Sequence, residues 1–156
     1  MFELTSHSQE KTKQIGTAIG ELAQASDLIL LVGNLGSGKT CLTQGIGWGI
    51  GFEGYASSPS FVLVREYQGR IPLYHIDLYR LDSIEEIAEL GIDDYLYGNG
   101  LCVIEWADKA LDYFPSEYLC IEFDLLGKNE RKLSFLANGN RYANLMEQLK
   151  QKWNLR

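Results

Sequence analysis

A glycine-rich stretch at residues 32–40 carries the residue types best suited to chemistry on phosphates. Its sequence, VGNLGSGKT, matches the pattern G-x-x-x-x-G-K-[ST], in which Gly33, Gly38, Lys39 and Thr40 occupy the fixed positions. In such a loop backbone N–H groups surround phosphate oxygens, the lysine reaches the β- and γ-phosphates, and the threonine hydroxyl ligates Mg²⁺. The stretch predicts a nucleoside triphosphate site. The ordinary alternative is a glycine-rich turn with a surface lysine.

The loop and the residue that follows it form the predicted nucleotide-binding segment. It comprises Gly33, Asn34, Leu35, Gly36, Ser37, Gly38, Lys39, Thr40 and Cys41. Ser6 and Ser8, close to the start of a predicted helix, are candidates for lining a base pocket. Ser60 lies with two other serines beside a proline in the segment 55–60, where the hydroxyls either sense the γ-phosphate or belong to a plain polar turn.

Two carboxylates each follow a predicted strand. Glu105 comes directly after residues 101–104, and Asp77 comes directly after residues 72–76. Because ligands bind at the carboxyl ends of parallel strands, we expect both side chains beside the loop. One would hold the metal and the other would orient or deprotonate the attacking water, and the residue types alone leave the assignment of these two roles open.

The elements that must position these residues follow from the apolar pattern. Residues 27–32 predict a buried strand and residues 41–50 a helix, which together supply the context that the loop requires. Further strands are predicted at 61–67, 72–76, 101–104, 118–125 and 131–136, with helices at 6–25, from Ser83 onward and at 142–153. The glycines between residues 45 and 54 predict a helix that is weak toward its end or packs closely on the sheet.

The composition predicts one globular domain, residues 1–156, with a net charge of −7. Residues 127–156 hold 7 basic and 2 acidic side chains, so the rest of the chain is strongly acidic. Affinity for nucleic acid comes largely from Lys and Arg, which predicts a poor stand-alone binder of nucleic acid. No apolar run approaches the roughly 20 residues that span a bilayer, and the N-terminus lacks a signal-peptide layout. We therefore expect a cytoplasmic protein without a membrane contact, in which Cys102 and Cys120 are buried thiols.

Three further motifs make the pattern more specific than the loop alone. They are Ser58-Pro59-Ser60-Phe61, the run HIDLYRL at residues 75–81, and Ile104-Glu105-Trp106. With the loop, in this order and spacing, the chain resembles the TsaE (YjeE) family, small bacterial ATPases of tRNA threonylcarbamoyladenosine biosynthesis. The resemblance extends over most of the chain and includes its total length.

The resemblance implies a fold, cofactors and residue roles. The implied fold is α/β, a P-loop NTPase-like three-layer sandwich with a mixed, mainly parallel sheet flanked by helices. ATP and Mg²⁺ are the implied cofactors. In the family, Lys39 contacts the phosphates, Thr40 and Glu105 hold Mg²⁺, and Asp77 is an acidic residue that takes part in catalysis. Trp106 lies beside the site, and residues near the N-terminus border the adenine. The family's S-P-T-F motif has serine at Ser60, which keeps the hydroxyl and lacks the methyl group.

The resemblance also implies TsaD and TsaB as protein partners, with tRNA reached only through their complex, which modifies the adenosine next to the anticodon. Two other functions stay open on the residues. A small-molecule kinase usually clamps phosphates with several arginines, whereas residues 41–126 hold only Arg65, Arg70 and Arg80. A nucleotide-switched binding module is disfavoured by the two carboxylates. The chain lacks an N-K-x-D motif, which favours ATP over GTP.

Overall fold

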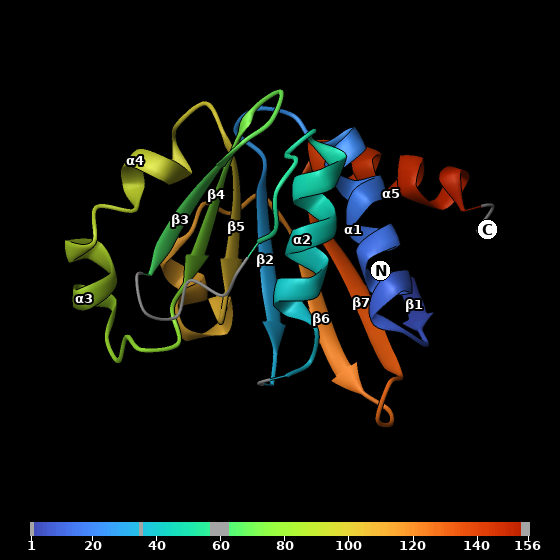
Figure 1. Cartoon of the computed structure of the whole chain (residues 1–156). Coiled ribbons are helices and arrows are strands. Elements are labelled where there is room, and N and C mark those ends of the chain that lie inside the picture. The colour runs from blue at the N-terminus through green and yellow to red at the C-terminus, as the bar shows by residue number, and fades with distance from the viewer. Residues whose placement is uncertain (1, 35, 57–62, 154–156) are drawn as a thin grey trace.

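The computed structural model describes residues 2–34, 36–56 and 63–153. These residues form a 7-stranded sheet with helices on both faces (Figure 1). The strand order is β1-β7-β6-β2-β5-β4-β3. The strands are β1 (Phe2–Ser6), β2 (Leu28–Gly33), β3 (Val64–Gln68), β4 (Pro72–Asp77), β5 (Leu101–Glu105), β6 (Tyr118–Leu125) and β7 (Arg131–Asn138). The sheet is mixed, as predicted.

The centre of the sheet is parallel and its edges are antiparallel. Strands β6, β2, β5 and β4 run parallel to one another, whereas β7 and β1 on one side and β3 on the other pair antiparallel. Every residue of β5 is buried, which agrees with its apolar sequence, because a central parallel strand is covered on both faces. The carboxyl ends of β2, β4 and β5 therefore meet at one edge, where α2 begins (Figure 1).

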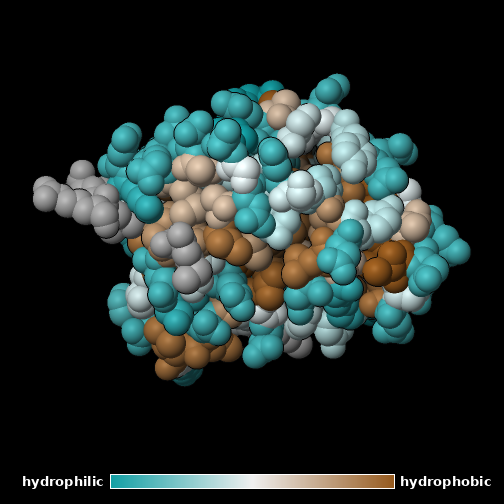
Figure 2. All heavy atoms as spheres, turned by 180° about the vertical axis from the view of Figure 1, so that it is seen from behind, coloured by the Kyte–Doolittle hydropathy of each residue, from teal (hydrophilic) through white to brown (hydrophobic). Residues whose placement is uncertain are grey.

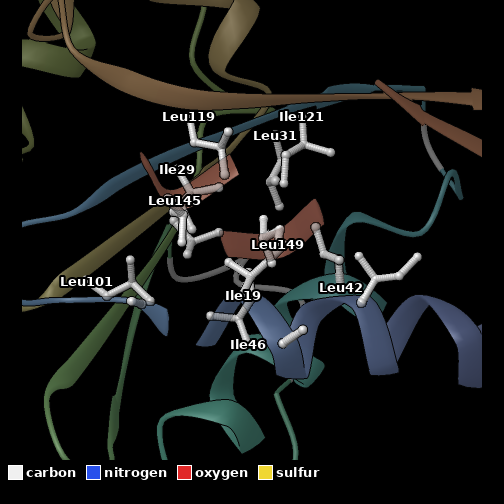
Figure 3. Packing of buried hydrophobic residues seen from close by; sticks show 14 of the residues in the cluster. Ile19, Ile29, Leu31, Leu42, Ile46, Leu101, Leu119, Ile121, Leu145 and Leu149 are labelled. Carbon is white, nitrogen blue, oxygen red and sulfur yellow. The ribbon is translucent and has the colours of Figure 1, made fainter. Parts of the chain in front are cut away.

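Three long helices cover one face of the sheet. They are α1 (Gln9–Leu22), α2 (Lys39–Gly49) and α5 (Asn140–Lys152). Figure 3 shows Ile19 of α1, Ile46 of α2 and Leu149 of α5 packed in one cluster with strand residues, which include Ile29, Leu31, Leu101, Leu119 and Ile121. Burial of such side chains, at about 25 cal/mol per Å² of apolar surface, is the main force that joins this layer to the sheet.

Shorter elements cover the other face. They are α3 (Ile84–Glu89), α4 (Asp93–Leu96) and the 3₁₀ helix η1 (Ala107–Tyr113). A second buried cluster joins them to the sheet through side chains such as Leu30, Ile76 and Ile104. The two clusters and the sheet between them make the predicted three-layer α/β sandwich.

Where the helices α1 and α2 cross, glycines of each helix lie against the backbone of the other. A Cβ atom on Gly45 would lie 2.1 Å from the carbonyl oxygen of Lys13, and one on Gly16 would lie 2.2 Å from that of Leu42. Gly20 and Gly49 make the same kind of approach one turn further on. α2 is regular to Gly49 despite these glycines, and the close packing is on α1 rather than on the sheet.

Several boundaries differ from the predictions. The helix predicted from Ser6 begins at Gln9, after the unpredicted strand β1, and Ser8 is its N-cap, accepting a hydrogen bond from the Lys11 N–H at 3.0 Å. The elements α4 and η1 were also not predicted. The strand predicted at 61–67 is seen from Val64 in β3, and residues 61 and 62 lie outside the described part. Among the described residues, no helix is long and apolar enough to cross a membrane.

Some apolar side chains reach the surface at the turn between β6 and β7. Leu125 is 48% exposed and Leu126 is 53% exposed. Seen from behind, apolar atoms gather at the end of the molecule where this turn lies (Figure 2). This hairpin extends beyond the helices that cover the rest of the sheet.

Candidate nucleotide-binding site

A pocket of about 500 Å³ lies at the edge of the sheet where β2, β4 and β5 end. It collects residues from α1, the glycine-rich loop, the ends of β4 and β5, and the start of β7. The lining residues are Gln9, Thr12, Gly36, Ser37, Gly38, Lys39, Thr40, Cys41, Asp77, Tyr79, Arg80, Glu105, Trp106 and Arg131. The glycine-rich loop and both candidate carboxylates therefore share one pocket.

The loop takes its shape from glycine and leads directly into α2. Gly36 and Gly38 have φ angles of 75° and 109°, which L side chains rarely adopt. Gly38 is also the N-cap of α2, and it provides no side-chain bond to the first amides of that helix. A helix start with unsatisfied N–H groups and a partial positive charge is suited to an anion such as phosphate.

Lys39 is held inside the pocket, 4% exposed. Its ammonium group donates a hydrogen bond to the carbonyl oxygen of Gly33 and lies 3.5 Å from the ring centroid of Trp106. Burial lowers the pKa of Lys39, and the negative charges of Glu105 and Asp77 act in the opposite direction. These contacts hold the ammonium group at the base of the loop.

Trp106 and Tyr79 form an aromatic wall of the pocket. Their ring centroids are 5.0 Å apart, and Tyr79 is 46% exposed. Trp106 has φ 61° and ψ 33°, a left-handed conformation that is uncommon for a bulky residue. This conformation follows directly on Glu105, and the Trp106 ring lies over the Lys39 ammonium.

The two carboxylates are neighbours across the sheet. Asp77 and Glu105 are register partners in the parallel pair β4–β5, and they are 2% and 3% exposed. The Thr40 hydroxyl donates to Glu105 Oε2 at 3.2 Å, whereas Asp77 Oδ1 accepts the Tyr79 N–H at 2.8 Å. The prediction that both acids end parallel strands beside the loop agrees with this arrangement.

The oxygens of Thr40 and Glu105 fit a magnesium site. Adjacent ligands of an octahedral Mg²⁺ lie about 2.9 Å apart, since each is 2.0–2.1 Å from the ion. The separation of 3.2 Å between Thr40 Oγ1 and Glu105 Oε2 is close to that value. Among the described residues no group of three or more His, Cys, Asp or Glu side chains could hold a metal.

Two residues that the sequence reasoning did not select as site residues support the pocket. His75 is fully buried and hydrogen-bonds through Nε2 to Glu105 Oε2. Arg131 donates to the loop, from Nε to the carbonyl of Ser37 at 2.7 Å and from Nη2 to that of Gly36 at 3.4 Å. A signal for His75 was available, because it lies two residues before Asp77 and so on the same face of the strand.

The remaining predicted residues lie in different places. Of the predicted segment, residues 36–41 line the pocket, whereas Gly33 and Asn34 are not among its described lining residues. Leu35 and Ser60 lie outside the described residues. Burial raises the pKa of the Cys41 thiol, whose hydrogen bond goes to the Gln9 carbonyl at 3.3 Å.

The two N-terminal serines are not brought into the pocket. Ser6 is fully buried and shares a hydrogen bond of 2.7 Å with the Thr12 hydroxyl, and Ser8 caps α1. Thr12 and Gln9 line the pocket instead. The N-terminal segment therefore contributes to the pocket wall through the first turn of α1.

The mostly parallel sheet centre, the glycine loop between β2 and α2, and the acids at the ends of β4 and β5 define a P-loop NTPase-like α/β protein. Residues 6–133 match the family described as "Threonylcarbamoyl adenosine biosynthesis protein TsaE". The chain belongs to the TsaE family.

Individual relatives agree with this assignment. The chain is 40% identical over 147 residues to the tRNA threonylcarbamoyladenosine biosynthesis protein TsaE of Bacillus subtilis, covering 94% of this chain and 92% of that protein. It is 36% identical over 129 residues to the protein of the same name from Treponema pallidum, covering 83% of this chain and 96% of that protein. The crystal structure of Bacillus subtilis YdiB superposes with a TM-score of 0.86 at 36% identity, covering 98% of this chain and 96% of that one.

Proposed function

We propose that this protein binds ATP with Mg²⁺ in the pocket and hydrolyses the bond between its β- and γ-phosphates, which releases ADP and inorganic phosphate. The observation that carries the proposal is the convergence of Lys39, Thr40, Asp77 and Glu105, from three separate elements, on one pocket at the start of α2. Phosphoryl transfer needs a positive charge on the phosphates, two metal-holding oxygens and a group that serves the water, and these four side chains supply them.

Each residue has a distinct role in the proposal. Lys39 places its charge on the β- and γ-phosphates, and the amides of the loop donate to the phosphate oxygens. Thr40 and Glu105 hold Mg²⁺, which neutralises charge that develops on the phosphate oxygens. Asp77 orients the attacking water and accepts its proton, and the Tyr79 N–H fixes the orientation of the Asp77 carboxylate.

Membership of the TsaE family supports a role of this protein in tRNA threonylcarbamoyladenosine biosynthesis. A net charge of −7 gives the chain little electrostatic affinity for a phosphate backbone. We therefore propose that it acts in the cytoplasm on a protein assembly of TsaD and TsaB, and reaches tRNA only through that assembly. ATP binding and hydrolysis would change a surface that these partners recognise.

Phosphate release by the purified protein, alone and mixed with TsaD and TsaB, tests the proposal. We expect slow release that requires Mg²⁺, stimulation by the partners, and little binding to isolated tRNA at physiological salt. The Lys39→Ala variant should abolish release and greatly weaken ATP binding, because it removes the charge from the phosphates. Absence of ATP binding by the unmodified protein would refute the proposal, and fast release unaffected by TsaD and TsaB would refute its partner-dependent part.

A further inference from the structure

We propose that His75 is a positioning residue that holds the Glu105 carboxylate in the orientation needed for Mg²⁺ binding. His75 donates its Nε2–H to Oε2 of Glu105, the oxygen that also accepts the Thr40 hydroxyl. The inference rests on the proposed ATP and Mg²⁺ function and deepens it. It assigns to this site a residue that supports a metal ligand without contacting the metal.

The sheet brings His75 and Glu105 to the same face. In the parallel pair of β4 and β5, His75 is opposite Val103 and Asp77 is opposite Glu105. Side chains alternate along a strand, so His75, Asp77 and Glu105 share the face on which Leu73 and Val103 join the cluster beneath α2. The start of α2, with Thr40, lies over this face, so the imidazole supports the carboxylate from the sheet.

Because Glu105 is buried, the protein groups that donate hydrogen bonds to it determine the orientation of its carboxylate. The residue is only 3% exposed, so protein groups rather than bulk water set the orientation of the carboxylate. Thr40 supplies one donor at 3.2 Å, and it is itself a proposed metal ligand. Among the described residues the second donor is His75, which lies fully buried on a strand. Metal-ligating carboxylates are commonly fixed in this way by a hydrogen bond from behind.

The second ring nitrogen of His75 indicates that the imidazole is not there for packing alone. Nδ1 is buried and has no hydrogen-bond partner among the described residues. A neutral imidazole has one N–H donor and one acceptor nitrogen, so donation from Nε2 leaves Nδ1 as an unsatisfied acceptor. An apolar side chain of similar size would avoid that cost. What the imidazole contributes and an apolar side chain cannot is the hydrogen bond to Glu105.

The magnesium dependence of nucleotide binding tests the inference. Calorimetry with a non-hydrolysable ATP analogue, in EDTA and over a Mg²⁺ titration, is applied to the unmodified protein, His75→Leu and His75→Gln. In His75→Leu we expect a 10–100-fold rise in the Mg²⁺ concentration for half-maximal enhancement, with the affinity in EDTA unchanged. His75→Gln, whose amide can still donate to a carboxylate, should retain most of the normal Mg²⁺ response.

The control variant is His7→Leu, because the His7 side chain is 73% exposed and its only described charged partner is Glu130, at 3.5 Å. It should behave as the unmodified protein. If His75→Leu fails to fold, His75→Asn replaces it, since the shorter amide does not reach Glu105. Thermal unfolding of each variant records any loss of stability separately. In a Glu105→Ala background, replacing His75 should cause no further loss of Mg²⁺ response.

Two outcomes would overturn the inference. One is a normal Mg²⁺ response in His75→Leu or in its substitute His75→Asn. The other is an equal loss of affinity with and without Mg²⁺ in those variants, which marks a purely structural role. Failure of the proposed function is a different result, because the unmodified protein would then show no Mg²⁺-enhanced nucleotide binding at all.

Discussion

Arg131 and Ser37 are 94 residues apart in the sequence, yet Arg131 Nε donates to the Ser37 carbonyl oxygen at 2.7 Å. Arg131 is the first residue of β7 and is 9% exposed. A second bond, to the Gly36 carbonyl at 3.4 Å, comes from the same guanidinium. The shape of the glycine-rich loop therefore depends on an antiparallel strand that lies outside the strand-loop-helix unit itself.

Replacement of Arg131 should weaken nucleotide binding. A hydrogen bond to a charged group is worth about 1.5–3 kcal/mol, so Arg131→Ala should lower ATP affinity by about tenfold or more, through a less ordered loop. Arg131→Lys should recover only part of this, because one ammonium cannot reproduce the two guanidinium bonds. Calorimetric titration with ATP measures both variants, and Arg65→Ala on the exposed part of β3 is the matched control. Unchanged affinity in Arg131→Ala would show that the loop keeps its shape unaided.

Substitutions of the two carboxylates should have different effects on nucleotide binding and turnover. Glu105→Gln should weaken Mg²⁺-dependent nucleotide binding, because it removes a charged metal ligand. Asp77→Asn should spare binding and lower turnover by roughly 10²–10⁴-fold, the usual contribution of a general base. Its amide oxygen can still accept the Tyr79 N–H, so the local structure should persist. Binding titrations and phosphate release on the same preparations decide the matter. The opposite pattern would exchange the two roles.

Gly45→Ala should destabilise the protein. Its new Cβ would lie 2.1 Å from the Lys13 carbonyl, and overpacking of this kind typically costs about 1–3 kcal/mol or more. Helix propensity alone predicts the reverse sign, a gain of about 1 kcal/mol. Urea unfolding measures the difference. Gly127→Ala is the control, since its nearest neighbour would be the Glu130 Cβ at 3.9 Å, and it should change stability by less than about 0.5 kcal/mol.

Cys102 should make the stability of the protein fall at high pH. Burial raises the pKa of its thiol from 9.0 to about 12. The neutral thiol is thus favoured in the folded state, and its contribution is complete below pH 9 and is lost as pH rises toward 12. Relative to Cys102→Ala, the unfolding free energy should decrease by about 2 kcal/mol between pH 9 and pH 11. Urea unfolding of both proteins across this range gives the difference, and parallel pH profiles would show that the thiol ionises freely in the folded state.

The pattern of apolar residues along the sequence predicted those helices and strands whose side chains are completely buried or are buried at regular intervals. The strand β5 is buried throughout, and its apolar run was sufficient to predict it. β1 has only alternate burial over 5 residues, and its pairing with β7, including the stack of Phe2 on Phe135 at 4.6 Å, is a tertiary effect. The 4-residue helix α4 is too short to carry a periodic signal.

The same distinction applies to the pocket. Asp77 and Glu105 were predictable as neighbours because each follows a predicted strand, and parallel strands bring such positions together. Arg131 was not predictable, since its role depends on the return of the chain through the β6–β7 hairpin to the loop. Ser6 is a residue for which the prediction was wrong. It was a candidate for lining a base pocket, but it is fully buried and hydrogen-bonded to Thr12.

The glycine crossing of α1 and α2 has a mechanical consequence for any working cycle. Helices that slide past each other do so by small readjustments of the side chains between them. Where the two backbones are in direct contact, no side chains lie between them. We therefore expect these two helices to move together as a rigid body. The spacing between Gln9 and Thr40, two lining residues of the pocket on these helices, should then stay nearly constant. A widening of the pocket around a ligand would then involve lining residues outside these two helices, such as Tyr79 and Trp106.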